Sequence, residues 1–157
     1  MNETKFIKEL RQSFVNSAVR NNRETPLTWK LRGSASTAGR PDLIIIDRGK
    51  TFFIETKVCT LKQNIDLMSL LSPLQRVNLE LIIAAGGNAF LVVLLRDRYA
   101  IAVKLHEMTM FSDLLPETLH VCSLEEFDPF YIPDTSFLLT KVKGQWHGVE
   151  HFALACK

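Results

Sequence analysis

A short hairpin with acidic residues at its open end constrains the fold of this chain more than any other feature of its sequence. Leu43–Ile46 has the unbroken apolar run of a buried strand, Asp47–Lys50 has the composition of a turn, and Thr51–Ile54 reads as the returning strand. If the two strands pair directly across the turn, Asp42 before the first strand lies opposite Glu55 after the second.

Three polar groups therefore converge at one end of the hairpin. Side chains alternate between the two faces of a strand, so Lys57 emerges on the same face as Glu55. Both strands are apolar at consecutive positions, and charged groups beside buried strands must be paired or bind something. Two carboxylates and an amine can hold a divalent cation and activate a water molecule. In the structural alternative, Asp42 is only a turn residue and Glu55 with Lys57 form the charge pattern of an edge strand.

Length and composition indicate an ordinary globular protein. With 157 residues, 46% of them hydrophobic and 23% charged, a single domain over residues 1–157 is expected. The net charge of +2 does not by itself indicate nucleic-acid binding. Basic residues nevertheless concentrate in the first third of the chain, around the acidic pair, and this favours a polyanionic substrate. They are Arg20, Arg23, Lys30, Arg32, Arg40, Arg48 and Lys50.

Cysteine usage and the N-terminus bear on the compartment. The three cysteines show no close metal-ligand spacing and are typical of reduced thiols in a cytosolic protein. The N-terminus lacks an apolar signal region, and no stretch approaches the ~18 apolar residues of a membrane helix. We therefore expect a cytoplasmic protein, or one in the host-cell cytoplasm if its source is viral, without a membrane partner.

The first helix is expected from Glu3 to about Val19, with Asn2 as its cap. Its apolar stripe includes Ile7 and Phe14, and Glu3 falls on the same stripe by helical spacing. The Glu3 carboxylate can serve a site at the end of this buried face, or it can simply stabilise the helix N-terminus through the helix dipole. The sequence leaves both roles open.

A second helix is expected to begin at Ser72-Pro73-Leu74-Gln75, which combines an N-cap, a proline at the first helical position and a capping box. Its apolar side is predicted to be Leu74, Val77, Leu81 and Ile82. The order of helices and strands indicates an α/β fold with a mixed central β-sheet flanked by helices. Further strands are expected at Leu27–Leu31, Asn88–Leu95, Tyr99–Val103 and Phe137–Lys143, with a helix over His106–Leu115 and a turn over Gly144–Trp146.

Histidines and tryptophans in the chain are weaker candidates for function. His147 and His151 have the spacing of a zinc pair, but no further ligand accompanies them and a surface role is favoured. Trp29 is expected in the core rather than stacked on a base. For Trp146, stacking on nucleic acid and packing on the core both remain open.

Four motifs together resemble the PD-(D/E)XK nuclease superfamily, in particular its VRR-NUC branch and the Holliday junction resolvases. They are Gly39–Ile44, Phe53–Lys57, Leu71–Arg76 and Ala85–Phe90. A Pro-Asp…Glu-x-Lys pattern followed by a Ser-Pro-x-Gln helix start and a Gly-Gly-strand is more specific than the first pattern alone. The resemblance implies a restriction-endonuclease-like fold, with a catalytic core over about residues 1–104 and a C-terminal extension over 105–157.

The resemblance also implies metal-dependent hydrolysis of DNA phosphodiester bonds. Asp42 and Glu55 would ligate Mg²⁺ or Mn²⁺, with the backbone carbonyl of Thr56 as a further ligand. Such a metal would lower the pKa of a bound water and neutralise charge on the phosphate. Lys57 would orient or deprotonate that water, or stabilise the transition state.

Other site residues follow from the same resemblance. Glu3 is similar to a carboxylate of the family's N-terminal helix, with Glu9 as the alternative. Gln75 is similar to a glutamine that the family places near its active site, although the capping box also explains it. DNA contacts are predicted from residues in and beside the flexible segment before Pro41. These residues are Lys30, Arg32, Ser34, Ser36 and Arg40.

The favoured function is a magnesium-dependent endonuclease selective for branched DNA, such as a Holliday junction, in replication, recombination or repair. The reason for this selectivity is size, because 157 residues leave little room for a separate base-reading domain. Such enzymes often dimerise to cut two strands, so a homodimer is an expected assembly. One alternative is a catalytically inactive DNA-binding or assembly module of the same fold, and the other is a sequence-specific restriction-type endonuclease.

Overall fold

The computed structural model describes residues 2–31, 39–59, 67–96, 98–105 and 136–157. Its elements are α1 (Glu3–Arg20), β1 (Leu27–Lys30), β2 (Leu43–Asp47), β3 (Lys50–Val58), the 3₁₀ helix η2 (Leu67–Leu70), α2 (Pro73–Ala84), β4 (Asn88–Arg96), β5 (Tyr99–Leu105), β6 (Ser136–Val142), β7 (Gln145–His147) and α5 (Glu150–Ala155). Within these ranges, seven strands form one sheet in the order β1-β2-β3-β4-β5-β6-β7. Only β3 and β4 pair in parallel, and α2 lies between them in the chain. The predicted α/β fold with a mixed central sheet flanked by helices is confirmed.

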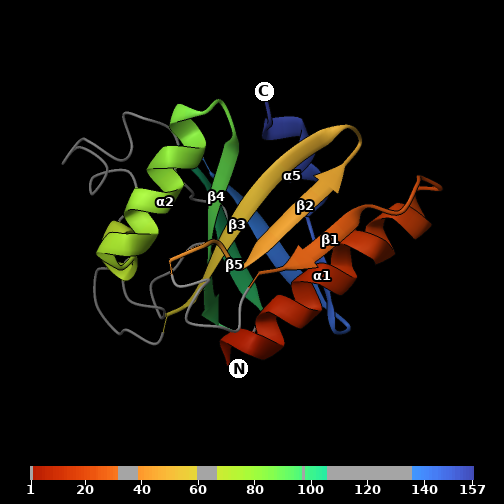
Figure 1. Cartoon of the computed structure of the whole chain (residues 1–157). Helices are drawn as coiled ribbons and strands as arrows, with labels where there is room; N and C mark the ends of the chain where they lie inside the picture. The colour runs from red at the N-terminus through yellow and green to blue at the C-terminus, as the bar shows by residue number, and fades with distance from the viewer. Residues whose placement is uncertain (1, 32–38, 60–66, 97, 106–135) are drawn as a thin grey trace.

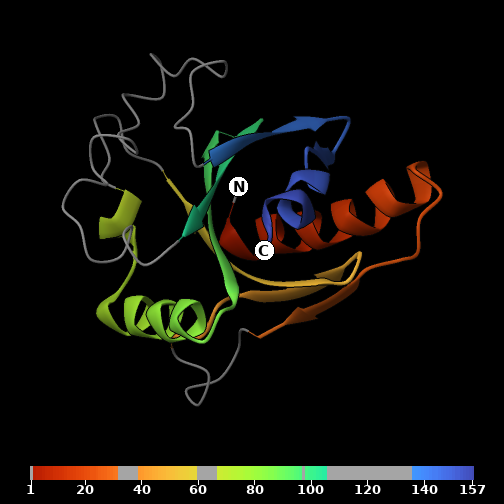
Figure 2. The same cartoon turned by 90° about the horizontal axis from the view of Figure 1, so that it is seen from above.

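The sheet curls around α1 and α5, while α2 packs on its opposite face beside β4 (Figures 1 and 2). Aromatic rings fill the core inside the curl, where Phe52, Phe90 and Phe152 are fully buried. The Phe152 ring stacks on Phe52 with centroids 5.5 Å apart and meets Phe90 edge-on at 4.9 Å. A second core under α2 is centred on Leu79, Leu91 and Val103. Burial of these two cores fixes both helical layers against the sheet.

The hairpin formed by β2 and β3 has the predicted register, with Ile46 opposite Thr51 and Asp47 opposite Lys50. Its two turn residues, Arg48 and Gly49, both have positive φ angles, 52° and 75°. Positive φ at both central positions is the geometry of a type I′ turn, whose twist matches the twist of the flanking strands. The turn therefore sets the register that carries through to the open end of the hairpin.

Both predicted helix starts are confirmed. The Asn2 side chain accepts a hydrogen bond from the backbone N–H of Lys5 at 2.8 Å, and the predicted stripe of α1 is buried. Ser72 caps α2 in a complete capping box with Gln75. A hydrophobic stripe and a cap are local signals, so they are readable from the sequence.

Three of the four residues predicted for the apolar side of α2 are wrong, and only Ile82 lies on the buried side. Leu79 is the buried residue of this helix and Ile82 packs partly against the same core, whereas Leu74 and Val77 are each 49% exposed and Leu81 is 62% exposed. Apolar residues occur almost all round α2, so the hydrophobic pattern does not select one face. Leu79 and Ile82 follow Gln75 by four and seven residues, and the contact of Gln75 with β3 therefore belongs to the buried face.

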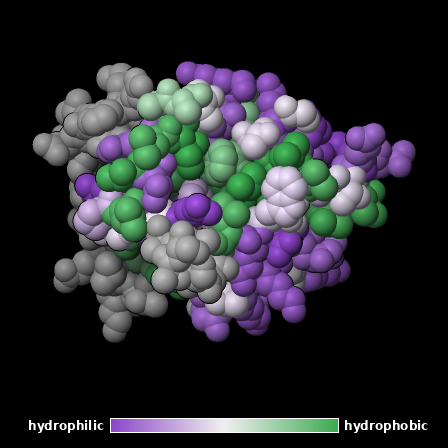
Figure 3. All heavy atoms as spheres, in the orientation of Figure 1, coloured by the Kyte–Doolittle hydropathy of each residue, from purple (hydrophilic) through white to green (hydrophobic). Residues whose placement is uncertain are grey.

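The two tryptophans have opposite environments. The core position predicted for Trp29 is wrong, because the side chain is 51% exposed on the edge strand β1. Trp146 is fully buried, which settles its open interpretation in favour of the core, and it packs edge-on against Phe6 at 5.3 Å. Figure 3 shows hydrophobic side chains over α2 and over β1 and β2 on this face of the molecule.

Smaller differences concern the C-terminal part. The turn predicted over Gly144–Trp146 is confirmed at Gly144, whereas Gln145 and Trp146 already belong to strand β7. The short helix α5 has no counterpart in the sequence-based expectations. The helix predicted over His106–Leu115 lies outside the described residues. No helix in the described ranges has both the length and the hydropathy needed to cross a bilayer.

The contrast between the tryptophans gives a test of the fold. Trp146→Ala should lower the free energy of unfolding by about 3–5 kcal/mol, because it removes a buried aromatic side chain. Trp29→Ala should change it by no more than about 0.5 kcal/mol, because the side chain is largely exposed. Urea denaturation measures both values. The fluorescence of each single-tryptophan variant is the control, since Trp146 alone should emit at shorter wavelength than Trp29 alone. Equal destabilisation by the two substitutions would contradict this packing.

Candidate metal centre

Asp42 is held at the open end of the β2–β3 hairpin by Thr56. The Asp42 Oδ2 atom accepts one hydrogen bond from the Thr56 backbone N–H at 2.8 Å and another from the Thr56 hydroxyl at 2.7 Å. Both bonds reach the same oxygen, so the carboxylate is fixed in orientation while Oδ1 carries neither of them. Asp42 is 6% exposed, and Thr56 is fully buried.

Glu55 is the residue before Thr56 on β3, and its exposure is 1%. Its Oε1 atom accepts a hydrogen bond from the Gln75 side-chain amide at 2.8 Å and lies 3.5 Å from the Lys57 ammonium. Its Oε2 atom is buried and has no hydrogen-bond partner among the described residues. A buried carboxylate oxygen without a partner is costly, and in native proteins it requires an explanation such as a bound ion.

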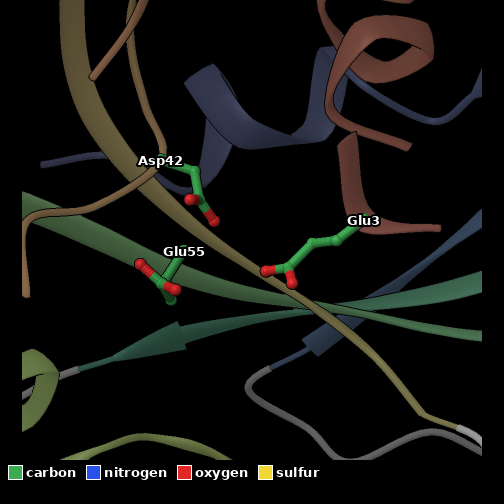
Figure 4. Close-up of side chains that lie close together, drawn as sticks. All are labelled: Glu3, Asp42 and Glu55. Carbon is green, nitrogen blue, oxygen red and sulfur yellow. The ribbon is translucent and has the colours of Figure 1, made fainter. Parts of the chain in front are cut away.

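Glu3 comes to the same place from the first turn of α1. The helix is anchored to β7, where the Ser13 hydroxyl accepts a hydrogen bond from the Trp146 backbone N–H at 2.9 Å. Because Glu3 shares the buried stripe of α1, docking of that stripe directs its carboxylate toward the hairpin. Figure 4 shows the Glu3, Asp42 and Glu55 carboxylates pointing toward one another.

The three carboxylates meet the geometric requirement for one cation. One oxygen from each of Glu3, Asp42 and Glu55 lies within 4.8 Å of the others, and these are the residues that form such a group in the described part of the chain. Ligand oxygens at about 2.1 Å from Mg²⁺ are separated by at most about 4.2 Å, so small side-chain rotations suffice. Carboxylate oxygens are the donors that Mg²⁺ and Mn²⁺ prefer. The partnerless Oε2 atom of Glu55 fits the same group.

Lys57 and Gln75 complete the immediate surroundings. The Lys57 side chain is 21% exposed, so its ammonium reaches both Glu55 and solvent. Gln75 makes both contacts that its two possible roles require, because its Oε1 atom accepts from the Ser72 backbone N–H while its Nε2 atom donates to Glu55. The capping box thus fixes the amide that orients Glu55.

The Thr56 backbone carbonyl remains a predicted ligand. The N–H and C=O of one strand residue point to the same side, and the Thr56 N–H is directed at Asp42. Its carbonyl therefore faces the edge at which Asp42 lies. The Thr56 hydroxyl bond to Asp42 is an additional function that sequence reasoning missed, since the motif gives the side chain at this position no chemical role.

The described residues of the site hold more acidic than basic groups, because three carboxylates lie together beside the Lys57 ammonium. Burial, and then the neighbouring Asp42 carboxylate, raise the pKa of Glu55 from its ordinary 4.5 to about 8. Lys57 opposes this rise in pKa, while Glu3 adds to it. A bound divalent cation would favour the ionised form of all three acids.

The alternative carboxylate, Glu9, is positioned elsewhere. It accepts a hydrogen bond from the Trp146 indole at 3.3 Å and pairs with the Lys141 ammonium at 3.0 Å. The structure therefore brings Glu3, and not Glu9, to the acidic pair. His147 and His151 do not join an acidic or cysteine cluster within the described residues.

Basic residues predicted around the site divide into two groups. Arg23 and Arg48 lie at the turn end of the hairpin, where both pair with buried Asp47 at 3.0 and 3.4 Å. Lys30 and Arg40 lie on the other side, near the open end of the hairpin, and both are exposed. The predicted DNA-binding residues Arg32, Ser34 and Ser36 lie outside the described residues.

Comparisons with known proteins give a limited result. No family model matches the chain, and no curated protein matches it. Among solved structures, the chain is similar to Hjc, a Holliday junction resolvase from the archaeal hyperthermophile Archaeoglobus fulgidus, with 11% sequence identity and a TM-score of 0.42. The similarity covers 85% of this chain and 88% of that chain.

The raised pKa of Glu55 predicts how stability depends on pH when divalent cations are removed. Between about pH 4.5 and pH 8 the folded protein keeps a proton on Glu55 that the unfolded chain releases, so stability falls as pH rises through this window. Glu55→Gln removes this loss. In EDTA, the variant should melt at least a few degrees higher than the wild type at pH 8.5, and the difference should disappear near pH 4.5.

Thermal unfolding followed by circular dichroism measures this difference. Glu24→Gln is the matched control, because Glu24 is exposed, and its melting curve should follow the wild type at every pH. Parallel pH profiles for the wild type and Glu55→Gln would show that the pKa of Glu55 is not raised in the folded protein.

Proposed function

We propose that this protein is a Mg²⁺- or Mn²⁺-dependent nuclease of restriction-endonuclease-like fold that hydrolyses DNA phosphodiester bonds. The observation that carries the proposal is the convergence of Glu3, Asp42 and Glu55 beside the Lys57 ammonium, with one Glu55 oxygen buried and partnerless. In a purely structural ion pair, both oxygens of a buried carboxylate are expected to have hydrogen-bond or charged partners. The arrangement therefore supports a binding site over a purely structural cluster.

Both hairpin acids are arranged to present one oxygen and fix the other. In Asp42 the two bonds from Thr56 hold Oδ2, and in Glu55 the Gln75 amide holds Oε1. Preorganised ligands lose little conformational freedom on binding, which favours tight and geometrically defined coordination. Asp42, Glu55, Glu3 and the Thr56 carbonyl are the groups that would hold the ion.

A cation bound here supplies a Lewis acid for the scissile phosphate and lowers the pKa of a coordinated water. Lys57 would supply the remaining chemistry from the chain itself. Its ammonium lies 3.5 Å from Glu55 Oε1 and is partly open to solvent, so it can hold the attacking water or donate to a non-bridging phosphate oxygen. Gln75 acts as a positioning residue, because it touches Glu55 and is anchored by the cap of α2.

We further propose that branched DNA is the preferred substrate. Support comes from the sequence, because its four motifs, Gly39–Ile44, Phe53–Lys57, Leu71–Arg76 and Ala85–Phe90, resemble those of the Holliday junction resolvases. A homodimer would present two such centres to two strands of a junction. The intact set of acids and lysine disfavours the alternative of an inactive DNA-binding module.

A cleavage panel tests this function. We expect Mg²⁺-dependent cutting of a labelled four-way junction in preference to flap, linear duplex and single-stranded DNA, and no cutting in EDTA. Asp42→Asn should lower the rate by at least about 100-fold, and Lys57→Ala by about 10²–10⁴-fold. Glu9→Gln is the matched control, since Glu9 lies on α1 outside the cluster, and it should keep the wild-type rate.

The other outcomes separate the alternatives. One fixed cleavage pattern on linear duplex would indicate sequence-specific restriction. Tight binding of DNA without cutting by the wild type would indicate the inactive module. Undiminished cutting by both Asp42→Asn and Lys57→Ala would remove these residues from the mechanism.

A further inference from the structure

A groove of about 720 Å³ runs between one side of α1 and the edge strand β1. Its lining includes Lys5, Lys8 and Arg11 from the helix and Thr28 and Lys30 from the strand. The two elements lie side by side in Figure 1, and hydrophilic side chains follow the α1 side of the molecule in Figure 3. None of the three carboxylates lines the groove, although its residues Asn2 and Thr4 flank Glu3 in the chain.

The charge of this groove is one-sided. Four of its lining residues are basic, and none of the described residues that line it is acidic, although the whole chain has a net charge of only +2. The acids of α1 point elsewhere, because Glu3 reaches the carboxylate cluster and Glu9 pairs with Lys141. A concave surface lined by charge of one sign concentrates ions of the opposite sign.

Two hydrogen bonds connect the helix wall of the groove to its strand wall. Arg11 donates from Nε to the Thr28 hydroxyl at 3.2 Å and from a terminal nitrogen to the Thr28 carbonyl at 3.1 Å. These bonds cross from helix to strand and hold the guanidinium in place. A positively charged floor that is fixed before binding is suited to a polyanion, because little side-chain freedom is lost on association.

Two basic residues of the groove are neighbours of the carboxylate cluster, one along the chain and one across the sheet. Lys5 follows Glu3 by two residues, and Lys30 pairs with Leu43, the residue after Asp42. From Lys5 to Arg11 the helix rises about 9 Å, at about 1.5 Å for each residue. A nucleic-acid strand with a rise of about 3.4 Å per nucleotide passes two or three phosphates over this distance. The spacing of the cations thus matches a short run of backbone phosphates.

We propose that the groove between α1 and β1 binds the backbone phosphates of the DNA strand that enters the carboxylate centre. This inference rests on the proposed nuclease function, and it assigns the path of the substrate to Lys5, Lys8, Arg11 and Lys30. Only Lys30 of these was expected from the sequence to contact DNA. The contacts are to phosphates, so they position the strand without reading its sequence.

The test is the salt dependence of DNA binding, measured by fluorescence anisotropy in EDTA with a labelled duplex and a labelled single strand. Lys5→Gln/Lys8→Gln should reduce the magnitude of the slope of log Kd against log salt by about 1.8 for duplex, which is about 0.9 for each lost phosphate contact. Its Kd at low salt should rise at least about tenfold. Lys143→Gln/Lys157→Gln is the matched control, since it removes the same charge from exposed lysines outside the groove.

Equal slopes for the two double variants, or no DNA binding by the wild type, would overturn the groove proposal. Displacement of DNA by polyglutamate as effective as displacement by unlabelled DNA would also overturn it, because the groove would then select any acidic polymer. The parallel Mg²⁺ cleavage assay keeps the two proposals distinguishable. Cutting by the wild type with unchanged binding by Lys5→Gln/Lys8→Gln rejects the groove alone, whereas groove-dependent binding without cutting rejects the nuclease alone.

Discussion

The hydrogen bonds from Thr56 to Asp42 are the interaction on which the candidate site depends. They close the open end of the β2–β3 hairpin and hold one acid against the strand that carries the other. The Arg48-Gly49 turn determines the register and therefore which residues meet at that end. A shift of one residue in this register would turn Glu55 and Lys57 to the other face of the sheet. The chemistry of the site is thus a consequence of a local turn.

The helices complete the site through their packing. Burial of the α1 stripe against the concave sheet brings Glu3 to the hairpin acids, and burial of Leu79 rotates α2 so that Gln75 faces Glu55. The packing of buried apolar residues therefore positions both polar side chains, Glu3 and Gln75. Glu55 carries the main energetic cost of this arrangement, because burial raises its pKa to about 8 and one of its oxygens has no partner among the described residues. Functional sites commonly carry such an uncompensated group, because a ligand supplies the missing interaction.

Local signals made most of the fold and the core of the site predictable. Turn chemistry, strand alternation and helix caps are encoded within a few residues, and they placed Asp42, Glu55 and Lys57 together. Tertiary packing decided the rest. The rotation of α2 was mispredicted because its sequence is apolar on several sides, and Trp29 was misplaced because nothing local marks β1 as an edge strand. The choice between Glu3 and Glu9 required the docking of α1, which joins residues 133 positions apart at Ser13 and Trp146.

Calorimetric titration with Mn²⁺ near pH 7, in buffers of different ionisation enthalpy, is the most direct test of the claim that these carboxylates form a metal site. We predict one bound ion and the release of close to one proton, because Glu55 is protonated in the metal-free protein at this pH. Affinity should fall by about tenfold or more in Glu3→Gln and persist in Glu9→Gln. Absence of Mn²⁺ binding would contradict the claim that these carboxylates form a metal site. Equal Mn²⁺ affinities in the wild type and an Asp42→Asn/Glu55→Gln double variant would contradict it as well.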